Sequence, residues 1–305
     1  MNKKQLLFGI VVLMAASLVA IAQDTQTDRV TVPLTNPGKP GTVKVDVLMG
    51  SIKVVGYEGK EVIVEAKPRE KMIGEDRDEE GLAAHITAAI AGSTGRKDKD
   101  KEKSAKDKTA GMKRIPIENT GLTVEEDNNN VSIEVESYRR TVDLSIKVPY
   151  ATSLKLSGTN LDDIGIIVEN VSGEIEIEGT NGGIVLKNVS GTVVANTTNG
   201  DIEATLAQVT PNKPMSFVTF NGDVDVTLPA ETKATLSLKS SMGDVYSDFD
   251  IVLKQMPVKS EESGRSDRGK FRVSLDRAFS GAINGGGPEF KLQNFNGNIY
   301  IRKKK

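Results

Sequence analysis

Residues 169–186 read ENVSGEIEIEGTNGGIVL, and residues 187–204 read KNVSGTVVANTTNGDIEA. The two segments align without a gap, so the repeating unit has 18 residues and two halves. Each half is a short run of alternating apolar residues that follows a glycine corner. A fixed short period with one strand per half is typical of a solenoid of stacked strands. The repeat therefore predicts an all-β protein built as a single parallel β-helix, or β-solenoid.

The corners of the repeat carry one recurrent signal, in which glycine most often follows asparagine or serine. Glycine and asparagine tolerate positive φ better than other residues do, so we expect the chain to turn with positive φ at each corner. The predicted structural corners are Gly173, Gly182, Gly191, Gly200, Gly222, Gly243 and Gly297.

Within each half, residues two apart share one face of the strand, so alternate apolar residues point inward. The expected inward pairs in neighbouring coils are Ile175 with Val193, Ile177 with Ala195, Ile184 with Ile202, and Leu186 with Ala204. The polar residues between them, such as Glu176 and Glu203, are expected to face water. Asn170 and Asn188 recur at the same place in the unit, and we expect them to form a stacked amide ladder.

Asn-Gly is also a strong hairpin signal, which leaves an antiparallel meander open as the alternative fold. The regular alternation of Ser-Gly and Asn-Gly corners within the unit favours the solenoid. Beyond Gly200 the spacing widens to 22 residues at Gly222 and then to 21 residues at Gly243.

The composition restricts the core and the partners. The hydrophobic fraction is 37% but the aromatic fraction is only 4%, with no Trp, so the core must be mainly aliphatic, which suits narrow stacked coils. The absence of Cys excludes disulfides and thiolate chemistry. A formal net charge of −2 points neither to nucleic acid nor to a strongly anionic partner.

Residues 1–22 have the three regions of a secretory signal peptide. Lys3 and Lys4 precede an apolar run, and the small residues Ala20 and Ala22 fit a cleavage site after Ala22. The alternative is an uncleaved anchor helix, although the run is at the short limit for spanning a bilayer. We expect an exported protein in the periplasm or at the cell surface.

The rest of the chain is interrupted by a charged insertion. Residues 23–66 hold N-terminal strands of the β-domain, residues 67–114 form the insertion, and residues 115–305 form the β-repeat domain. Residues 79–91 are rich in Ala and predict a short helix. Residues 96–114 cannot bury enough apolar surface to offset the entropy of ordering, so the insertion is expected to be largely disordered. Its interpretation is either weak contact with an anionic surface or a solvated loop.

Within the β-repeat domain, residues 127–130 read DNNN, which predicts a hairpin turn between two strands. Residues 248–270 include a second charged stretch and are expected to form a surface loop. Residues 271–275 and 297–301 are expected to close the domain.

Several of these features together resemble the bacterial putative-adhesin family of β-strand-repeat domains of unknown function. They are the export signal, the early strands, Val148-Pro149 and the units of the form [Asn/Ser]-Gly-[Asp/Gly]-[Ile/Val]. The resemblance covers about residues 30–66 and 115–303. It implies a right-handed β-helix-like fold in exported proteins, without an established catalytic activity, and it supplies no functional residues. The insertion departs from the compact pattern of the family.

The sequence offers few groups for chemistry. His85 is the single histidine and lies in the insertion, which argues against a Ser-His-Asp centre and against zinc sites with several histidines. Asp201, Asp223 and Asp244 each follow a corner glycine, and stacking in register would align them along one edge. Carboxylates about 4.8 Å apart repel one another, which a divalent cation would relieve. The alternative is that each carboxylate accepts a hydrogen bond from the turn backbone. No cofactor is predicted.

Together these observations predict a non-enzymatic exported β-solenoid that acts as a binding, adhesin-like or scaffold module of the bacterial envelope. Its partner is an unknown envelope protein or a glycan. The alternative function is that of a carbohydrate-active enzyme, because parallel β-helices also carry polysaccharide lyases and hydrolases. Such an enzyme needs an acid pair, or an acid and a base, in a groove formed by long loops. The repeat shows only short corners.

Overall fold

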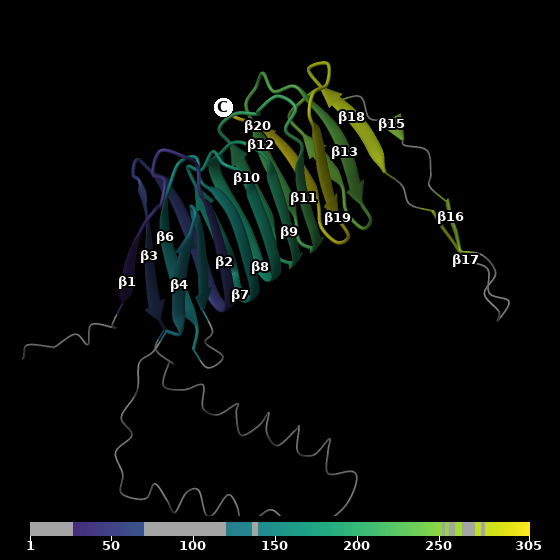
Figure 1. Ribbon diagram of the computed structural model, residues 1–305. Coiled ribbons are helices and arrows are strands. Elements are labelled where there is room, and N and C mark those ends of the chain that lie inside the picture. The colour runs from purple at the N-terminus through teal and green to yellow at the C-terminus, as the bar shows by residue number, and fades with distance from the viewer. Residues whose placement is uncertain are drawn as a thin grey trace, which may run out of the picture.

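The computed structural model describes residues 27–69, 120–135, 140–251, 254–255, 260–263, 272–275 and 278–305. Every regular element in these ranges is a β-strand, and most of the strands lie side by side in one elongated stack (Figure 1). No helix long and apolar enough to cross a membrane occurs among these residues. Several predictions concern residues outside these ranges. They are the signal peptide, the helix at 79–91, the role of His85, and the disorder expected for nearly all of the charged insertion.

Parallel stacking of the strands produces two faces that meet at the glycine corners. Three long strands run through a corner and take part in both faces: β2 (Thr42–Tyr57), β7 (Ser153–Glu169) and β8 (Ile175–Val189). In the later coils the halves are separate strands: β9 (Val193–Asn199) and β10 (Ile202–Leu206), β11 (Met215–Asn221) and β12 (Val224–Leu228), β13 (Ala234–Ser240) and β14 (Val245–Ser247), and β19 (Glu289–Asn294) and β20 (Ile299–Lys303). We call the face with β9 and β11 face one, and the face with β10 and β12 face two.

The register between coils is the one expected from the 18-residue unit. Ile202 lies opposite Ile184, and Val193 lies opposite Ile175, in parallel pairing. All four side chains are buried, whereas Glu176 is exposed. The predicted solenoid is therefore confirmed for this region, and the antiparallel meander is wrong.

At the N-terminal end, β2 lies between strands that come later in the chain. β5 (Asn130–Val135) and β6 (Val142–Pro149) pair with one edge of β2, and β7 pairs with the other. Antiparallel strands finish this end, since β1 (Asp28–Pro33) pairs with β3 (Glu61–Pro68), β3 with β6, and β4 (Leu122–Asp127) with β5. Asn128 and Asn129 have positive φ in the β4–β5 turn, which confirms the predicted hairpin.

Toward the C-terminal end, two strands enter the stack out of sequence order. β19 pairs with β11 on one side and with β13 on the other, and β20 lies between β12 and β14. Figure 1 shows the yellow β19 among the green strands. The expectation that residues 297–301 close the domain is therefore wrong, because β20 has an interior position. β18 (Phe279–Ile283) instead pairs with β13 in antiparallel orientation.

The described parts of the segment 248–270 include two short strands, which its charges do not predict. The two strands are β15 (Lys254–Gln255), which pairs with β18, and β16 (Ser260–Ser263). β16 pairs with β17 (Arg272–Leu275) in a separate two-stranded sheet. Residues 272–275 therefore do not close the main sheet.

Glycine is needed at the corners for two different reasons. Positive φ, as expected, occurs at Gly182, Gly191, Gly200, Gly222 and Gly297. Gly173 and Gly243 lack it, so that expectation is wrong for these two corners. A Cβ at Gly173 would lie 2.2 Å from the carbonyl oxygen of Thr152, and a Cβ at Gly243 would lie 1.8 Å from that of Gly297. There the stacked coils approach too closely for any side chain.

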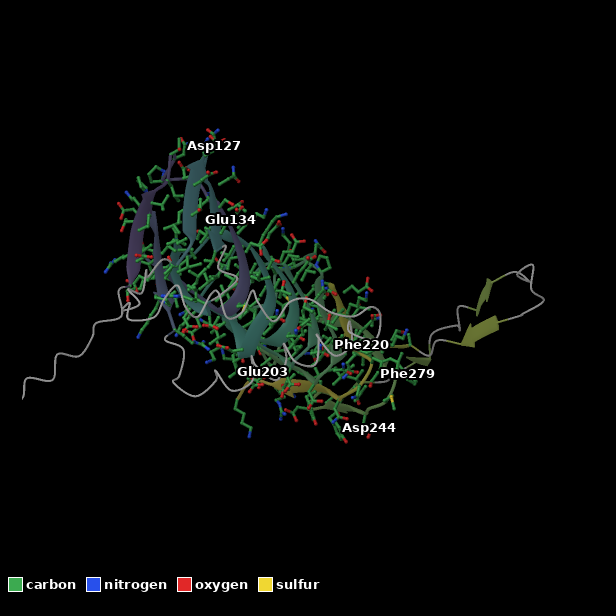
Figure 2. The ribbon with its side chains drawn as sticks, turned by 90° about the horizontal axis from the view of Figure 1, so that it is seen from below. Asp127, Glu134, Glu203, Phe220, Asp244 and Phe279 are labelled. Atoms are coloured by element: carbon green, nitrogen blue, oxygen red, sulfur yellow. The ribbon has the colours of Figure 1, made fainter. Side chains whose placement is uncertain are left out.

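The core runs the length of the stack and is mainly aliphatic, as the composition predicts. Its apolar members form one cluster, with Phe217, Phe249 and Phe290 as the aromatic side chains among them. Figure 2 shows the molecule from below, with Asp127 and Glu134 toward the N-terminal end and Phe220 and Phe279 toward the other. The outer surface is thus left to polar side chains, a few exposed rings and a few exposed aliphatic side chains such as Ile164 and Met242.

Candidate functional site

The Asn-Gly corners lie one above another along one edge of the solenoid, which we call the corner edge. Five coils share a five-residue pattern there, and each position of the pattern forms its own column. In spatial order the segments are Gly179-Thr180-Asn181-Gly182-Gly183, Thr197-Thr198-Asn199-Gly200-Asp201, Thr219-Phe220-Asn221-Gly222-Asp223, Asn294-Phe295-Asn296-Gly297-Asn298 and Ser240-Ser241-Met242-Gly243-Asp244.

The third position forms a ladder of side-chain amides. Each Nδ2 donates to the Oδ1 of the preceding coil at 2.8 to 3.0 Å, along the series Asn160, Asn181, Asn199 and Asn221. The ladder predicted at the Ser-Gly corners is also present, because Asn188 Nδ2 donates to Asn170 Oδ1 at 2.7 Å. These amides hold neighbouring coils in register.

Where the first position carries a side chain, that side chain bonds to the corner of the coil before it. Thr197 Oγ1 donates to the carbonyl oxygen of Gly182 at 3.1 Å, and Thr219 Oγ1 donates to that of Gly200 at 2.9 Å. Ser240 makes the same contact with Gly297. Because buried polar groups require partners, these side chains are structural.

The fifth position contains Asp201, Asp223 and Asp244, the residues for which the sequence suggested a divalent cation site. Asn298 lies between Asp223 and Asp244, because β20 lies between β12 and β14, so Asp201, Asp223 and Asp244 do not form a continuous row. Asp201 Oδ1 accepts the main-chain N–H of Asp223, and Asp223 Oδ1 accepts that of Asn298, each at 2.7 Å. The two carboxylates therefore hold the backbone of the next coil, as the alternative interpretation has it. Among the described residues, no group of three or more acidic or histidine side chains is arranged to hold a metal ion.

The second position points outward and carries exposed aromatic rings. Phe220 and Phe295 stack with their ring centroids 4.7 Å apart and their planes 1° from parallel. They are 51% and 43% exposed. On face two, Tyr246 and Tyr300 form a second stacked pair at 5.2 Å. Large apolar side chains left exposed together mark a candidate contact surface.

The Phe220–Phe295 pair was not predicted from the sequence, although a signal for it exists. Phe-Asn-Gly occurs at residues 220–222 and again at residues 295–297. The same residue at the same place in two corners indicates one column. Only the insertion of β19 beside β11 makes these two coils neighbours, however, and spacing along the chain does not show this insertion.

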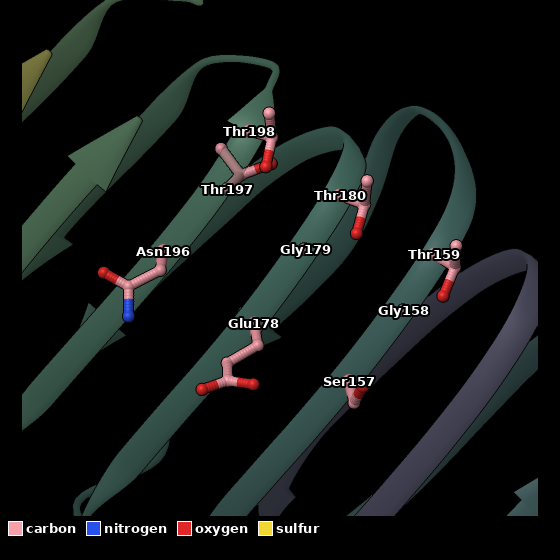
Figure 3. A pocket seen from close by; sticks show the side chains of 9 residues that line it. All are labelled: Ser157, Gly158, Thr159, Glu178, Gly179, Thr180, Asn196, Thr197 and Thr198. Carbon is pink, nitrogen blue, oxygen red and sulfur yellow. The ribbon is translucent and has the colours of Figure 1, made fainter. Parts of the chain in front are cut away.

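A shallow groove of about 310 Å³ lies on the corner edge and crosses three coils. Its lining comes from β7, β8 and β9 and consists of Ser157, Gly158, Thr159, Glu178, Gly179, Thr180, Asn196, Thr197 and Thr198. Figure 3 shows Thr159, Thr180 and Thr198 in one row near the corners. Ser157, Glu178 and Asn196 form a second row farther along the strands (Figure 3).

The polar side chains of these two rows are not engaged within the described part of the chain. None of the six makes a hydrogen bond or an ion pair with another described residue. Their neighbours Asn181 and Asn199, by contrast, are both used in the amide ladder. The groove therefore presents donors and acceptors that are free for a ligand.

A separate charged cluster ties coils together where the chain enters the insertion. Arg69 donates from Nε to Asp143 Oδ2 at 2.8 Å and from Nη1 to Asp162 Oδ1 at 2.9 Å, and Ser51 donates to Asp143 at 2.6 Å. Burial raises the pKa of Asp143, but the hydrogen bonds from Arg69 and Ser51 outweigh burial and lower that pKa overall. Hydrogen bonds to Asp162 and Asp143 raise the pKa of Arg69 above its usual range. The cluster is a clamp and leaves no free group for a ligand.

Comparisons with known proteins find similar structures and one matching family model. Two solved structures are similar at low identity. One, described as a putative cell adhesion protein from Clostridium sporogenes, is 12% identical with a TM-score of 0.41, covering 92% of this chain and 100% of that chain. The other, described as a putative adhesin from Bacteroides fragilis, is 9% identical with a TM-score of 0.36, covering 92% and 97%. No curated protein sequence matches the chain. Residues 166–284 match the family described as Toastrack DUF4097, which confirms the resemblance to a β-strand-repeat family of unknown function.

Proposed function

We propose that the protein is a non-enzymatic, exported binding module of the bacterial envelope, with an adhesin-like or scaffold role in the periplasm or at the cell surface. The observation that carries this proposal is the groove on the corner edge, where unengaged polar side chains lie one coil away from the half-exposed ring of Phe220. Polar groups that converge beside aromatic surface are typical of ligand sites. The signal sequence at residues 1–22 supports export.

The geometry of the groove favours binding over turnover. Glycoside hydrolysis needs two carboxyl groups that flank the bond to be cleaved. The residues that line the groove include one carboxylate, Glu178. Of the three acids singled out on this edge, Asp201 and Asp223 hold the backbone of neighbouring coils, and Asp244 lies in a coil beyond the Phe220–Phe295 pair.

Retention on bacterial envelopes tests the proposal. Labelled mature protein, beginning at Gln23, is mixed with washed envelopes and sedimented. We expect saturable retention that an excess of unlabelled protein abolishes. A variant without residues 70–112 measures what the basic segment 96–114 adds, and we expect only a small, salt-sensitive loss, because exposed charges are screened. Absence of saturable retention, or turnover of any polysaccharide in a broad panel, would contradict a binding module.

We propose that the signal peptide is removed after Ala22 during export. Expression of the full chain in a bacterium, followed by N-terminal sequencing of the envelope and periplasmic fractions, checks this. We expect material that begins at Gln23. Exported protein that still begins at Met1 would show a membrane-anchored protein instead.

A further inference from the structure

The groove on the corner edge ends at an apolar wall. Along β7, β8 and β9 both rows of the groove consist of polar residues, but in the next coil an apolar residue occupies each row. Val218 of β11 lies opposite Asn196, and Phe220 follows Thr198 in the row of threonines, between the paired positions Thr219–Thr197 and Asn221–Asn199. A ligand in the groove therefore has polar groups beneath it and an aromatic ring at its end.

The ring of Phe220 is half-exposed and is held by a neighbouring ring. One face stacks on Phe295, which directly follows β19, at 4.7 Å and nearly parallel. The other face is directed along the solenoid axis toward Thr198, because the ring stack follows the direction in which strands succeed one another. A ring locked by a neighbour loses little entropy when it binds a ligand.

The charge of the groove selects against anionic ligands. Glu178 is the only charged residue among its nine lining residues. Phosphates, nucleic acids and acidic polysaccharides need Lys or Arg at their contact surface, and Glu178 would repel them. The remaining polar groups are hydroxyls of Ser and Thr and the amide of Asn196, which both donate and accept hydrogen bonds. They match a ligand whose own groups are hydroxyls.

We propose that this groove binds a neutral, extended glycan that lies along the solenoid axis, with one sugar ring against the face of Phe220 that is turned away from Phe295. The proposal names the ligand of the binding function proposed above and rests on it. The faces of a sugar ring carry C–H bonds, which are attracted to the negative face of an aromatic ring. The sugar hydroxyls then exchange hydrogen bonds with Thr159, Thr180 and Thr198, and Glu178 accepts from others.

The regular spacing of the groove fits a polymer better than a single small molecule. Equivalent hydroxyls recur from coil to coil at the strand spacing of about 4.8 Å. Successive rings of an extended glycan recur at a comparable interval, so each ring meets the same set of partners. Several weak, repeated contacts add up along one chain.

Calorimetric titration of the mature protein with cellohexaose and with chitohexaose tests the inference, and a hexamer of galacturonate serves as the anionic comparison. We expect binding of at least one neutral hexasaccharide and none of the galacturonate hexamer. The variant Phe220→Ala is expected to bind about tenfold more weakly, the size of one lost stacking contact. The matched control is Tyr246→Ala, because Tyr246 is also 51% exposed and also belongs to a stacked pair, but lies on face two. Its affinity is expected to equal that of the wild type.

A second variant keeps the test independent of the aromatic pair. Thr198→Arg places a long side chain in the groove from an exposed position and is expected to abolish binding with an unchanged thermal midpoint. Tighter binding of the anionic hexamer, or equal affinity of the wild type, Phe220→Ala and Thr198→Arg, would overturn the inference.

The envelope experiment separates failure of this inference from failure of the proposed function. If no neutral hexasaccharide binds but envelopes still retain the protein, the glycan inference is wrong and the binding function stands. Retention that then depends on Phe220 would identify a protein partner at this edge. If envelopes do not retain the protein either, both are wrong.

Discussion

Ile184 and Ile202 lie opposite one another in adjacent coils, and both side chains are fully buried. Replacing either by Asp would bury a carboxylate without a partner, which costs several kcal/mol against a total stability of about 5–15 kcal/mol. Glu176→Asp is the control, because Glu176 is exposed, and we expect it to be almost silent. Urea unfolding of the three variants measures the difference.

Contact across the stack also predicts coupling between the two isoleucines. Ile184→Ala and Ile202→Ala together should depart from additivity by about 0.5 kcal/mol or more, because each side chain packs on the other. A double-mutant cycle in urea provides the measurement. If the two losses simply add, the side chains do not pack against each other, in contradiction to the register.

Gly173 tests whether close approach of the coils, rather than backbone conformation, requires glycine. A Cβ there would meet the carbonyl oxygen of Thr152 at 2.2 Å. We expect Gly173→Ala to lower the free energy of unfolding by about 1–3 kcal/mol, as overpacking does. Gly38 has no atom within 4 Å of its Cβ position, so Gly38→Ala should change stability by less than about 0.5 kcal/mol. Equal stabilities of the two variants would contradict the close contact.

These residues show what a sequence reveals and what it does not. The inward positions of Ile184 and Ile202 follow from alternation and period alone, both of which are written in the chain. The need for glycine at residue 173 was also visible, but its cause was not. Positive φ and close approach select the same residue, and only the neighbouring coil distinguishes them.

Elements of the solenoid are joined by different means at different points along the corner edge. On the corner edge, short polar side chains repeat from coil to coil. Near the start of the insertion, Arg69 of the segment after β3 instead joins Asp143 of β6 to Asp162 of β7. Such a clamp depends on charge and therefore on pH, unlike the amide ladder.

The pKa of Asp143 is lower in the folded protein than in the unfolded chain, which fixes the sign of its effect on stability. Its contribution is present above the ordinary carboxyl pKa of about 3.9 and is lost as the pH falls through the depressed folded value. Arg69 stays charged throughout this range. We expect Asp143→Asn to be less stable than the wild type at pH 7 by about 1 kcal/mol, since the pair is partly exposed, and the gap to narrow toward pH 2.

Urea unfolding at several pH values checks this prediction for the clamp between elements. Glu203→Gln on β10 serves as the control, because Glu203 is exposed and has no recorded partner among the described residues. A constant gap between the wild type and Asp143→Asn from pH 7 to pH 2 would show that the ion pair contributes nothing.

Pairing of elements was harder to predict than their existence. The hairpin at residues 127–130 was readable because its turn chemistry is local. The groove was not, because Ser157, Glu178 and Asn196 look like ordinary outward residues on three separate strands. They can be recognised as the lining of one groove only when the coils are stacked and Phe220 is seen at the end of the row.

For the molecule as a whole, β19 and β20 occupy interior positions in the stack, between strands that precede them in the chain. Deleting residues 289–305 removes the partners of β13 and β14 on their inner side. We expect the variant to lose hydrogen-exchange protection at residues 234–240 and to unfold at a lower temperature, while residues 175–206 stay protected. Deleting residues 70–112 is the control and should leave the thermal transition nearly unchanged. Retained protection at residues 234–240 would mean that β13 can dock directly on β11.

The place of β19 and β20 also bears on the order in which the chain is made. During synthesis or export, residues 215–247 emerge before residues 289–303. In the folded protein, however, the strands of residues 215–247 lie on either side of the later segment. The strands β13 and β14 therefore cannot form their final parallel pairs until that segment is available. Any earlier pairing with another strand must first be broken. A chain truncated before residue 289 would leave apolar side chains exposed between its last two coils. Proteases and chaperones could then bind this exposed surface. The interleaved order thus makes burial of the last coils conditional on arrival of the later strands.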